Sequence, residues 1–242
     1  MSLAEVKLGL QSYSLRRLSF EDALREVANL GLKFVEAYPE HLPPSVAEVG
    51  RARELCDRYG VRIVAHGVNH MPRDEGKLRE LFEFARQLGL EVLTADPDPD
   101  SFDLLDEMVE EYGVAVAIHN HGPGHRYATV SDVLRAVEGH SELIGMCLDT
   151  GHLVRAGEDP VEAVRRLGGR LHALHLKDVS AEGRDVVLGS GVVDFRALFR
   201  ALEELGLLRR VVLSVEYEPE PENPLPGIRK SLEHVIRALG SL

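Results

Sequence analysis

The feature that most constrains the fold of this chain is a regular alternation of short apolar runs with segments of helical spacing. The first apolar run is VKLGL at residues 6–10, and the eighth is RVVLSVEY at residues 210–217. Each run precedes a segment in which apolar residues recur every three to four positions, and the unit repeats every ~25 to 40 residues. Eight repeats of a strand followed by a helix predict an α/β fold, a single (β/α)8 TIM barrel, with an open doubly wound sheet as the alternative.

The chain length and the connections predict one domain. A chain of 242 residues has the length of one barrel, and no low-complexity linker divides it. The acidic, proline-rich stretch YEPEPENPLPG follows the eighth predicted strand, where a loop is expected. Two helical segments, residues 19–31 and 194–206, begin at a capping Ser or Asp and end at Gly. We therefore expect residues 1–242 to form a single TIM-barrel domain.

Charge and composition argue against several kinds of partner. The formal net charge is −12 and no run of Lys or Arg offers a groove for a phosphate backbone, so we expect no nucleic-acid partner. No apolar stretch approaches the ~20 residues of a membrane span, and the N-terminus lacks the pattern of an export signal, so we expect a cytoplasmic protein without membrane contact. Cys56 and Cys147 form no C-x-x-C pair and are predicted to be buried thiols. Homo-oligomerisation stays open.

Polar residues recur at the point where each predicted strand ends. In a TIM barrel the active site lies at the C-terminal ends of the strands. The residues at these positions are Gln11, Glu36, His66, Asp96, His119, Asp149, His175 with Lys177, and Glu216. Burying such groups without partners is costly, so their recurrence at one level of the barrel predicts a shared site.

The last four strands offer a set of metal ligands. Strand alternation points His175 into the barrel and His172 away from it. Imidazole and carboxylate groups together suit a divalent cation such as Mn²⁺, Co²⁺ or Zn²⁺. The predicted ligands are His119, Asp149, His175 and Glu216. For each of them, the alternative is a structural histidine or a carboxylate that caps the next helix.

Four motifs carry a resemblance to a known family. The chain contains CLDTGH, LHLKD, LGSGVVDF and LSVEYEPE in this order. They resemble the xylose isomerase-like TIM-barrel superfamily, and within it the sugar phosphate isomerase/epimerase family, which is related to ketose 3-epimerases, inosose dehydratase and dehydroshikimate dehydratase. The resemblance implies one divalent metal (Mn, Co, Mg or Zn) held by Glu, Asp, His and Glu from strands five to eight. The matching positions are His119, Asp149, His175 and Glu216, and His119 departs from the glutamate of many relatives.

The resemblance also implies a reaction. It implies a metal-dependent isomerase or epimerase that removes a proton next to the carbonyl of a sugar, keto-sugar or sugar phosphate, while the metal stabilises the enediolate. Glu216 is the expected base, with His119, His121 or His152 as the partner acid. The residues expected to bind this carbohydrate substrate are Glu36, His66, His121 and Lys177. Loss of a β-hydroxyl from the same intermediate would instead make the protein a dehydratase of the inosose or dehydroshikimate type.

Two other classes of function compete with this interpretation. An endonuclease IV-like zinc nuclease would use His66, Asp149, His152, His175 and Glu216. The acidic charge, the absence of Trp and the lack of a histidine in LKDVSAEGRDVVLGSG argue against it. A non-catalytic sugar- or metal-binding barrel is the third class.

Two loops have both a functional and a plain structural interpretation. The backbone amides of LGSG, residues 188–191, either bind a phosphate group or form a turn before the helix capped by Asp194. Arg126, in the loop after the fifth predicted strand, either meets an anionic substrate or is a surface arginine. We expect this second loop, which includes Tyr127, to be mobile above the site.

Overall fold

Eight parallel strands pair in the order β1-β10-β7-β6-β5-β4-β3-β2 and close into a barrel in the computed structural model, which describes residues 5–242. The barrel strands are β1 (Lys7–Gln11), β2 (Phe34–Ala37), β3 (Arg62–Met71), β4 (Val92–Pro97), β5 (Ala115–His119), β6 (Ile144–Asp149), β7 (Leu171–Leu176) and β10 (Val212–Val215). The pairing of β1 with β10, in which Lys7 lies opposite Val212, closes the circle. The predicted (β/α)8 TIM barrel is confirmed.

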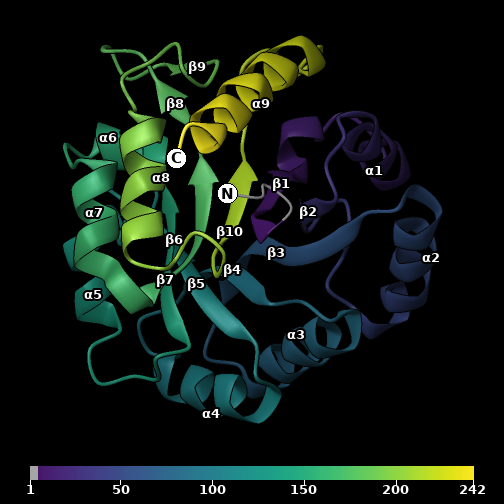
Figure 1. Ribbon diagram of the computed structural model, residues 1–242. Helices are drawn as coiled ribbons and strands as arrows, with labels where there is room; N and C mark the ends of the chain where they lie inside the picture. The colour runs from purple at the N-terminus through teal and green to yellow at the C-terminus, as the bar shows by residue number, and fades with distance from the viewer. Residues whose placement is uncertain (1–4) are drawn as a thin grey trace.

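The helices surround the strands as an outer layer (Figure 1). They are α1 (Phe20–Asn29), α2 (Val49–Tyr59), α3 (Glu75–Leu88), α4 (Phe102–Tyr112), α5 (Val130–Ala136), α6 (Thr150–Arg155), α7 (Pro160–Leu167), α8 (Phe195–Glu204) and α9 (Leu225–Gly240). Their apolar faces pack against the outside of the barrel, where Phe82, Phe84 and Phe199 are fully buried. Among the described residues, no helix combines the length and apolarity that a bilayer span requires.

Capping chemistry sets several helix ends. Ser19 and Asp194 each accept a backbone hydrogen bond from the first turn of α1 and α8, respectively. A cap of this kind stabilises a helix by about 1 kcal/mol. Gly31 and Gly206 follow the ends of the same helices in the left-handed conformation, with φ of +77° and +67°. Both helices therefore begin and end where their sequence indicates.

Small side chains fill the barrel interior beneath the C-terminal strand ends. The residues of this inner cluster are Val64, Ala65, Val92, Ala117, Cys147, Ala173 and Val212. Because Ala and Cys occupy little volume, polar side chains from opposite strands can meet above them. Glu36 of β2 and His175 of β7 do so, although β1 and β10 separate their strands in the barrel.

Strand β3 is longer than the sequence predicts. The apolar run VRIVAH ends at His66, whereas the strand continues to Met71. A register shift after His66 keeps the extension paired with β4, so that His70 lies opposite Asp96. Gly67 permits this close approach, because a Cβ atom there would lie 2.1 Å from Oγ1 of Thr94. His66 therefore lies within the strand and not at its end.

A short helix after β6 and a short hairpin after β7 are absent from the predicted alternation. Helix α6 follows β6 without a loop, and β8 (Asp178–Val179) pairs antiparallel with β9 (Asp185–Val186). Arg155 of α6 forms an ion pair of 2.6 Å with Asp185 and donates to the backbone O of Gly183. These contacts hold the β8–β9 hairpin against α6, next to the C-terminal ends of β6 and β7.

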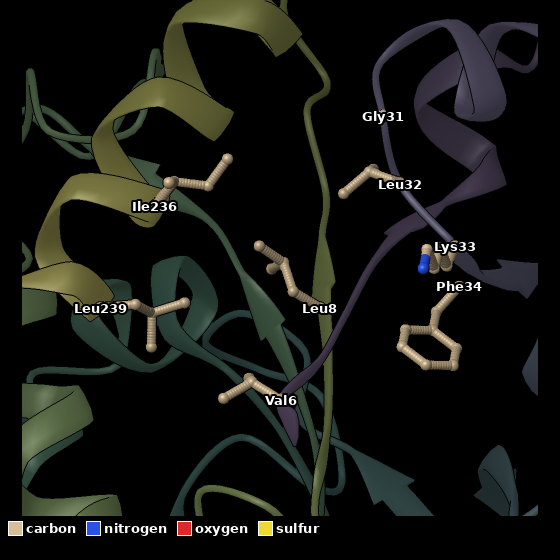
Figure 2. Close-up of a pocket in the computed structure, with 8 residues that line it drawn as sticks. All are labelled: Val6, Leu8, Gly31, Leu32, Lys33, Phe34, Ile236 and Leu239. Atoms are coloured by element: carbon tan, nitrogen blue, oxygen red, sulfur yellow. The ribbon is translucent and has the colours of Figure 1, made fainter. Parts of the chain in front are cut away.

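An apolar pocket of about 320 Å³ lies near the amino ends of β1 and β2, against α9 (Figure 2). The residues that line it are Val6, Leu8, Gly31, Leu32, Lys33, Phe34, Ile236 and Leu239. Among the described residues that line it, none is a histidine or a carboxylate, and Lys33 is the one ionisable side chain, so the pocket offers no set of metal ligands. The candidate active site is at the other end of the strands.

Candidate metal centre and adjoining pocket

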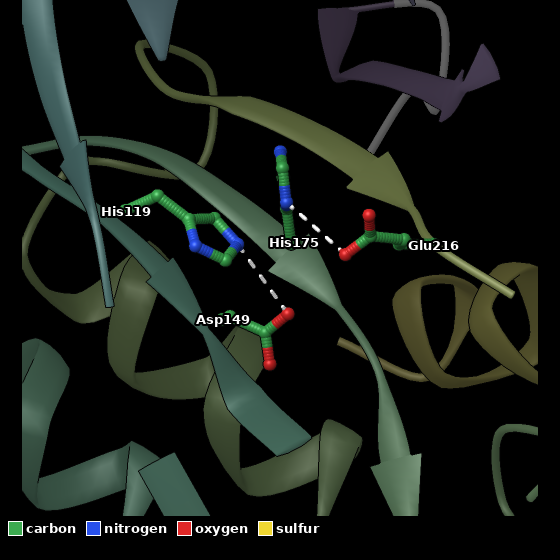
Figure 3. A group of neighbouring side chains, drawn as sticks. All are labelled: His119, Asp149, His175 and Glu216. Carbon is green, nitrogen blue, oxygen red and sulfur yellow. Dashed lines mark ion pairs between the residues drawn. The ribbon is translucent and has the colours of Figure 1, made fainter. Parts of the chain in front are cut away.

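Four buried side chains from adjacent strands converge at the C-terminal end of the barrel (Figure 3). His119 ends β5, Asp149 ends β6, His175 lies near the end of β7, and Glu216 follows β10. One nitrogen or oxygen atom from each lies within 4.8 Å of the others. Two closer pairs are visible: Nε2 of His119 lies 3.6 Å from Oδ2 of Asp149, and Nδ1 of His175 lies 3.3 Å from Oε2 of Glu216. Within residues 5–242, no other group of His, Cys, Asp and Glu has this geometry.

The free atoms of this group match the needs of a divalent cation. Buried atoms without a hydrogen-bond partner include Nε2 of His119, Oδ2 of Asp149, Nδ1 of His175 and Oε2 of Glu216. Buried polar atoms without partners are rare in proteins because each costs free energy. Neighbouring ligands bound at about 2.0–2.2 Å to one ion are roughly 3–4 Å apart, which is close to the spacing of the two pairs. The four side chains therefore fit a mixed nitrogen and oxygen coordination shell.

The local structure at the end of β6 orients Asp149. Its Oδ1 accepts a hydrogen bond of 2.7 Å from the backbone N of His152 and so caps α6. Asn120 accepts from the backbone N of Asp149 and donates to its backbone O. These bonds use Oδ1 and the backbone of Asp149, so that Oδ2 faces the centre. Burial alone would raise the pKa of Asp149, but Lys177 and His119 hold it well below its ordinary value.

Lys177 is buried among three carboxylates. Its Nζ lies 3.1 Å from Oδ2 of Asp149 and 3.1 Å from Oε2 of Glu216, and it also pairs with Glu218. Burial opposes the charged form, yet these carboxylates raise the pKa of Lys177 well above its ordinary value. Lys177 and His175 in turn lower the pKa of Glu216, again against the effect of burial. A permanent positive charge thus lies beside two of the candidate ligand atoms.

Glu36 does not line the pocket, contrary to its expected contact with substrate. Its fully buried carboxylate accepts a hydrogen bond from Nε2 of His175, with distances of 3.0 and 2.9 Å to its two oxygens. Oγ1 of Thr94 donates to it at 2.6 Å and Oγ of Ser214 at 2.7 Å. Because β2 points this side chain across the barrel, Glu36 contacts a candidate metal ligand and leaves no oxygen facing the pocket.

The structure does not bring His66 to the site either. Its fully buried ring lies edge-on to Phe84, with ring centroids 5.2 Å apart, and Nε2 donates to the backbone O of Leu42 at 2.9 Å. Strand alternation turns His66 toward the helices, since the preceding Ala65 belongs to the inner cluster. Burial lowers the pKa of His66, as expected for a neutral structural histidine.

His121 and His152 line the pocket together with His119. The ring centroids of His119 and His121 are 4.6 Å apart, and those of His121 and His152 are 6.0 Å apart. Burial, followed by the neighbouring histidines, lowers the pKa of His121 to about 3. Burial also lowers the pKa of His152, whose Nδ1 lies 3.2 Å from Nη1 of Arg155. Both rings are therefore neutral, a form that offers one hydrogen-bond donor and one acceptor.

The pocket has a volume of about 210 Å³ and includes residues that the sequence analysis does not identify. It is lined by Gln11, Tyr13, Tyr38, Gly67, Val68, His119, His121, His152, Lys177, Glu216 and Glu218. The unpredicted polar members are Tyr13, Tyr38 and Glu218. Each stands two positions after a strand-end residue, as Lys177 does after His175. Extended chain sends side chains two apart to the same face, so for Tyr38 and Glu218 this spacing is the signal that would have identified them. Tyr13 lies in a single 3-10 turn, Ser12–Leu15, which that argument does not cover.

The LGSG segment forms a turn around a buried carboxylate. The backbone amides of Gly189 and Gly191 donate to Oδ2 of Asp178 at 2.8 and 2.9 Å. Oδ1 of Asp178 accepts from the amides of Val179 and Val193. Because these amides already have an acceptor, they do not offer a phosphate site, and the structural interpretation of LGSG holds.

The loop after β5 is tied to the end of β4, where a mobile loop was expected. Nη1 of Arg126 forms an ion pair of 3.0 Å with Asp98. Tyr127 is buried, and its hydroxyl donates to the backbone O of Pro97 at 2.9 Å. The guanidinium of Arg126 is therefore engaged outside the pocket, and it is not among the residues that line it.

The chain matches a known protein family and several known proteins. The family model described as xylose isomerase-like TIM barrel matches residues 24–238. The chain is similar to the inosose dehydratase of Clostridium beijerinckii, at 27% identity over 160 residues that span 58% of this chain and 53% of the relative. It is also similar to the rhizopine catabolism protein MocC of Rhizobium meliloti, at 29% identity over 151 residues, or 55% of this chain and 46% of the relative. The alignments thus span about half the length of these relatives.

Solved structures with the same fold cover nearly the whole chain. An uncharacterized protein from Parabacteroides distasonis superimposes with a TM-score of 0.74 at 26% identity, covering 96% of this chain and 99% of that one. A D-psicose 3-epimerase from Clostridium cellulolyticum superimposes with a TM-score of 0.77 at 15% identity, also covering 96% and 99%, and this likeness concerns the fold. With a family model matched over most of its length, this chain belongs to the xylose isomerase-like TIM barrel family.

Proposed function

We propose that this protein is a divalent-metal-dependent enzyme that removes a proton next to the carbonyl of a small carbohydrate, as an isomerase or epimerase does. The observation that carries the proposal is the convergence at the pocket of four buried ligand atoms without a hydrogen-bond partner, from His119, Asp149, His175 and Glu216. The two carboxylate atoms among them also face the ammonium of Lys177. The family supports it, since its relatives include a protein named inosose dehydratase and a protein of the same fold named D-psicose 3-epimerase.

Five residues of the site have a proposed role. A divalent cation, when bound, would act as a Lewis acid that stabilises the enediolate. Glu216 is the candidate base, because it is the carboxylate that both reaches the centre and lines the pocket. The neutral rings of His121 and His152 are the candidate acids and hydrogen-bond donors. His119 is assigned to the metal, which uses its lone pair, and Lys177 supplies positive charge near a substrate oxygen.

The pocket favours an uncharged substrate over a sugar phosphate. Its volume of about 210 Å³ suits a small molecule, since drug-sized ligands occupy roughly 300–1,000 Å³. Phosphate recognition needs free cationic or amide donors. Lys177 faces three carboxylates, Arg126 pairs with Asp98, and the amides of LGSG bind Asp178. We therefore propose a neutral keto-sugar or cyclitol as the substrate class.

Dehydration is the second candidate, and it has an observation of its own in its favour. Several sequence relatives carry the name inosose dehydratase. Epimerisation uses a second base on the opposite face of the substrate, and His119 occupies the position that the resemblance assigns to that second carboxylate. A dehydratase needs one base and one acid for the leaving hydroxyl, which Glu216 and a neutral histidine can supply.

Deuterium exchange tests the shared step and separates the two outcomes. The protein is incubated with Mn²⁺ in D₂O with neutral ketohexoses, an inosose, and phosphorylated ketoses, and the mixture is followed by NMR. We expect metal-dependent deuterium incorporation next to the carbonyl of a neutral substrate, together with either an epimer or a product that has lost water. Glu216→Gln is expected to abolish the exchange, whereas Glu222→Gln, an exposed residue of the following loop, leaves it unchanged. Absence of exchange and of water loss with every substrate would contradict the proposal.

A further inference from the structure

We propose that Glu36 is a positioning residue for the metal centre: its carboxylate holds the proton of His175 on Nε2 and thereby aims the Nδ1 lone pair at the cation. This inference rests on the proposed function, because it assigns His175 as a ligand. It concerns a residue on β2, on the far side of the barrel from the strands that supply the four ligands.

The geometry of His175 separates its two ring nitrogens. Nε2 lies 3.0 and 2.9 Å from the two oxygens of Glu36, whereas Nδ1 has no hydrogen-bond partner and lies 3.3 Å from Oε2 of Glu216. A carboxylate accepts hydrogen bonds and does not donate them, so the nitrogen that faces Glu36 carries a proton. An imidazole that binds a cation keeps one proton and offers its other nitrogen. The contact with Glu36 therefore selects Nδ1 as the ligand atom.

Hydrogen bonds from two further strands hold the Glu36 carboxylate in place. Thr94 of β4 donates to Oε1 at 2.6 Å, and Ser214, which lies on β10, donates to Oε2 at 2.7 Å. With His175, three donors meet one carboxylate that has no exposed surface. The carboxylate is therefore a fixed acceptor with a single orientation.

This arrangement gives the chain a carboxylate–histidine pair behind the metal site. Such partners fix the tautomer and the ring orientation of a ligand and raise its basicity. Losing them weakens metal binding by about 10- to 100-fold in proteins that use them. A buried carboxylate is costly unless it is paired and hydrogen-bonded, and the ring of His175 is the ionisable partner of Glu36. The position of Glu36 is thus explained by what it does to His175.

Metal affinity and the protonation of His175 Nε2 test the inference together. Mn²⁺ affinity is measured by competition with a chelator for the wild type, Glu36→Gln, Thr94→Val and Ser214→Ala. We expect binding 10- to 100-fold weaker in Glu36→Gln, and a smaller loss in Thr94→Val and Ser214→Ala, which leave the carboxylate in place. Glu91→Gln is the matched control, since Glu91 pairs with Lys7 and Arg62 at the opposite end of the barrel. ¹⁵N NMR of metal-free and zinc-loaded wild type is expected to show a proton on Nε2 of His175 in both.

The outcomes distinguish this inference from the proposed function. Folded Glu36→Gln protein that binds Mn²⁺ as tightly as the wild type overturns the role of Glu36 and leaves the metal site intact. An unprotonated Nε2 in the wild type overturns it as well. If Glu36→Gln does not fold, unchanged affinity in both Thr94→Val and Ser214→Ala overturns it. A wild type that binds no cation overturns both the inference and the proposed function.

Discussion

Asp178 connects four backbone amides beside the candidate site, and its removal has a magnitude that follows from the structure. Its Oδ1 accepts from the amides of Val179 and Val193 at 2.9 and 3.1 Å, and both of these bonds are buried. Its Oδ2 accepts from the amides of Gly189 and Gly191 at 2.8 and 2.9 Å, and these bonds are half-buried. In Asp178→Ala, the amides of Val179 and Val193 stay buried without an acceptor, while those of the two glycines can be hydrated.

The free energies of these contacts set the expected loss of stability. A buried amide without a partner costs about 1–3 kcal/mol, and exchange of a hydrogen bond for hydration costs about 0.5–1.5 kcal/mol. The four bonds together give about 3–9 kcal/mol, so Asp178→Ala is expected to lower the free energy of unfolding by at least about 3 kcal/mol. Asp178→Asn keeps one side-chain oxygen that can accept from the buried amides of Val179 and Val193. We therefore expect it to lower the free energy of unfolding by only about 1–2 kcal/mol.

Urea unfolding followed by circular dichroism, with linear extrapolation to water, measures these differences. Asp194→Ala is the matched control, because Asp194 is exposed and makes one capping bond of 2.9 Å to the amide of Ala197. We expect this control to lose about 1 kcal/mol. A loss in Asp178→Ala no larger than in Asp194→Ala would refute the argument that Asp178 organises this segment.

Three further predictions concern ionisable groups that are buried or, as with Cys56, half-buried. Lys177→Met leaves three carboxylates without their ammonium, so the free energy of unfolding of the metal-stripped variant is expected to be lower by about 3–5 kcal/mol. Added Mn²⁺ is expected to raise the Tm of this variant by more than it raises the Tm of the wild type. An equal rise in Tm contradicts this. Burial lowers the pKa of His66, so below pH ~6.5 the unfolded chain binds more protons than the folded protein does. The free energy of unfolding therefore decreases as the pH is lowered, by at most about 1.4 kcal/mol per pH unit for this group. Urea unfolding at pH 7 and 5.5 is expected to show a smaller decrease in the free energy of unfolding for His66→Gln than for the wild type. An identical decrease in both proteins contradicts this. Burial raises the pKa of Cys56 and of Cys147 to about 11. Neither thiol is therefore expected to react with a disulfide reagent at pH 8 until urea unfolds the protein. Rapid labelling of the native protein contradicts this.

The barrel and the four candidate ligands follow from local patterns in the sequence. Apolar runs and helical segments specify the eight barrel strands and the long helices between them, and closure of the sheet brings all ends of these strands to one face. His119, Asp149 and Glu216 could be placed at that face because each ends or follows an apolar run. The inward direction of His175 follows from strand alternation, since Ala173 on the same face belongs to the inner cluster.

Contacts between distant strands could not be predicted in the same way. Glu36 was recognised as a strand-end residue, but its pairing with His175, 139 positions later, depends on how the closed barrel sets β2 opposite β7. His66 was misplaced because β3 continues beyond it to Met71 and because the pairing of β2 with β3 shifts at Val64, so that Ala65 faces inward and His66 outward. No apolar pattern signals this shift. The β8–β9 hairpin has strands of only two residues each, too short for any periodicity.

The central claim is that His119, Asp149, His175 and Glu216 hold one divalent cation, and metal content tests it most directly. Untagged protein purified without chelator is analysed for elements, as wild type and as Asp149→Ala, with Asp98→Ala as a control that pairs with Arg126 outside the pocket. The account predicts about one equivalent of a divalent metal in the wild type and in Asp98→Ala, and its loss in Asp149→Ala. Equal metal content in Asp149→Ala, or no binding by the wild type after reconstitution with Mn²⁺, Co²⁺, Mg²⁺ or Zn²⁺, would contradict it.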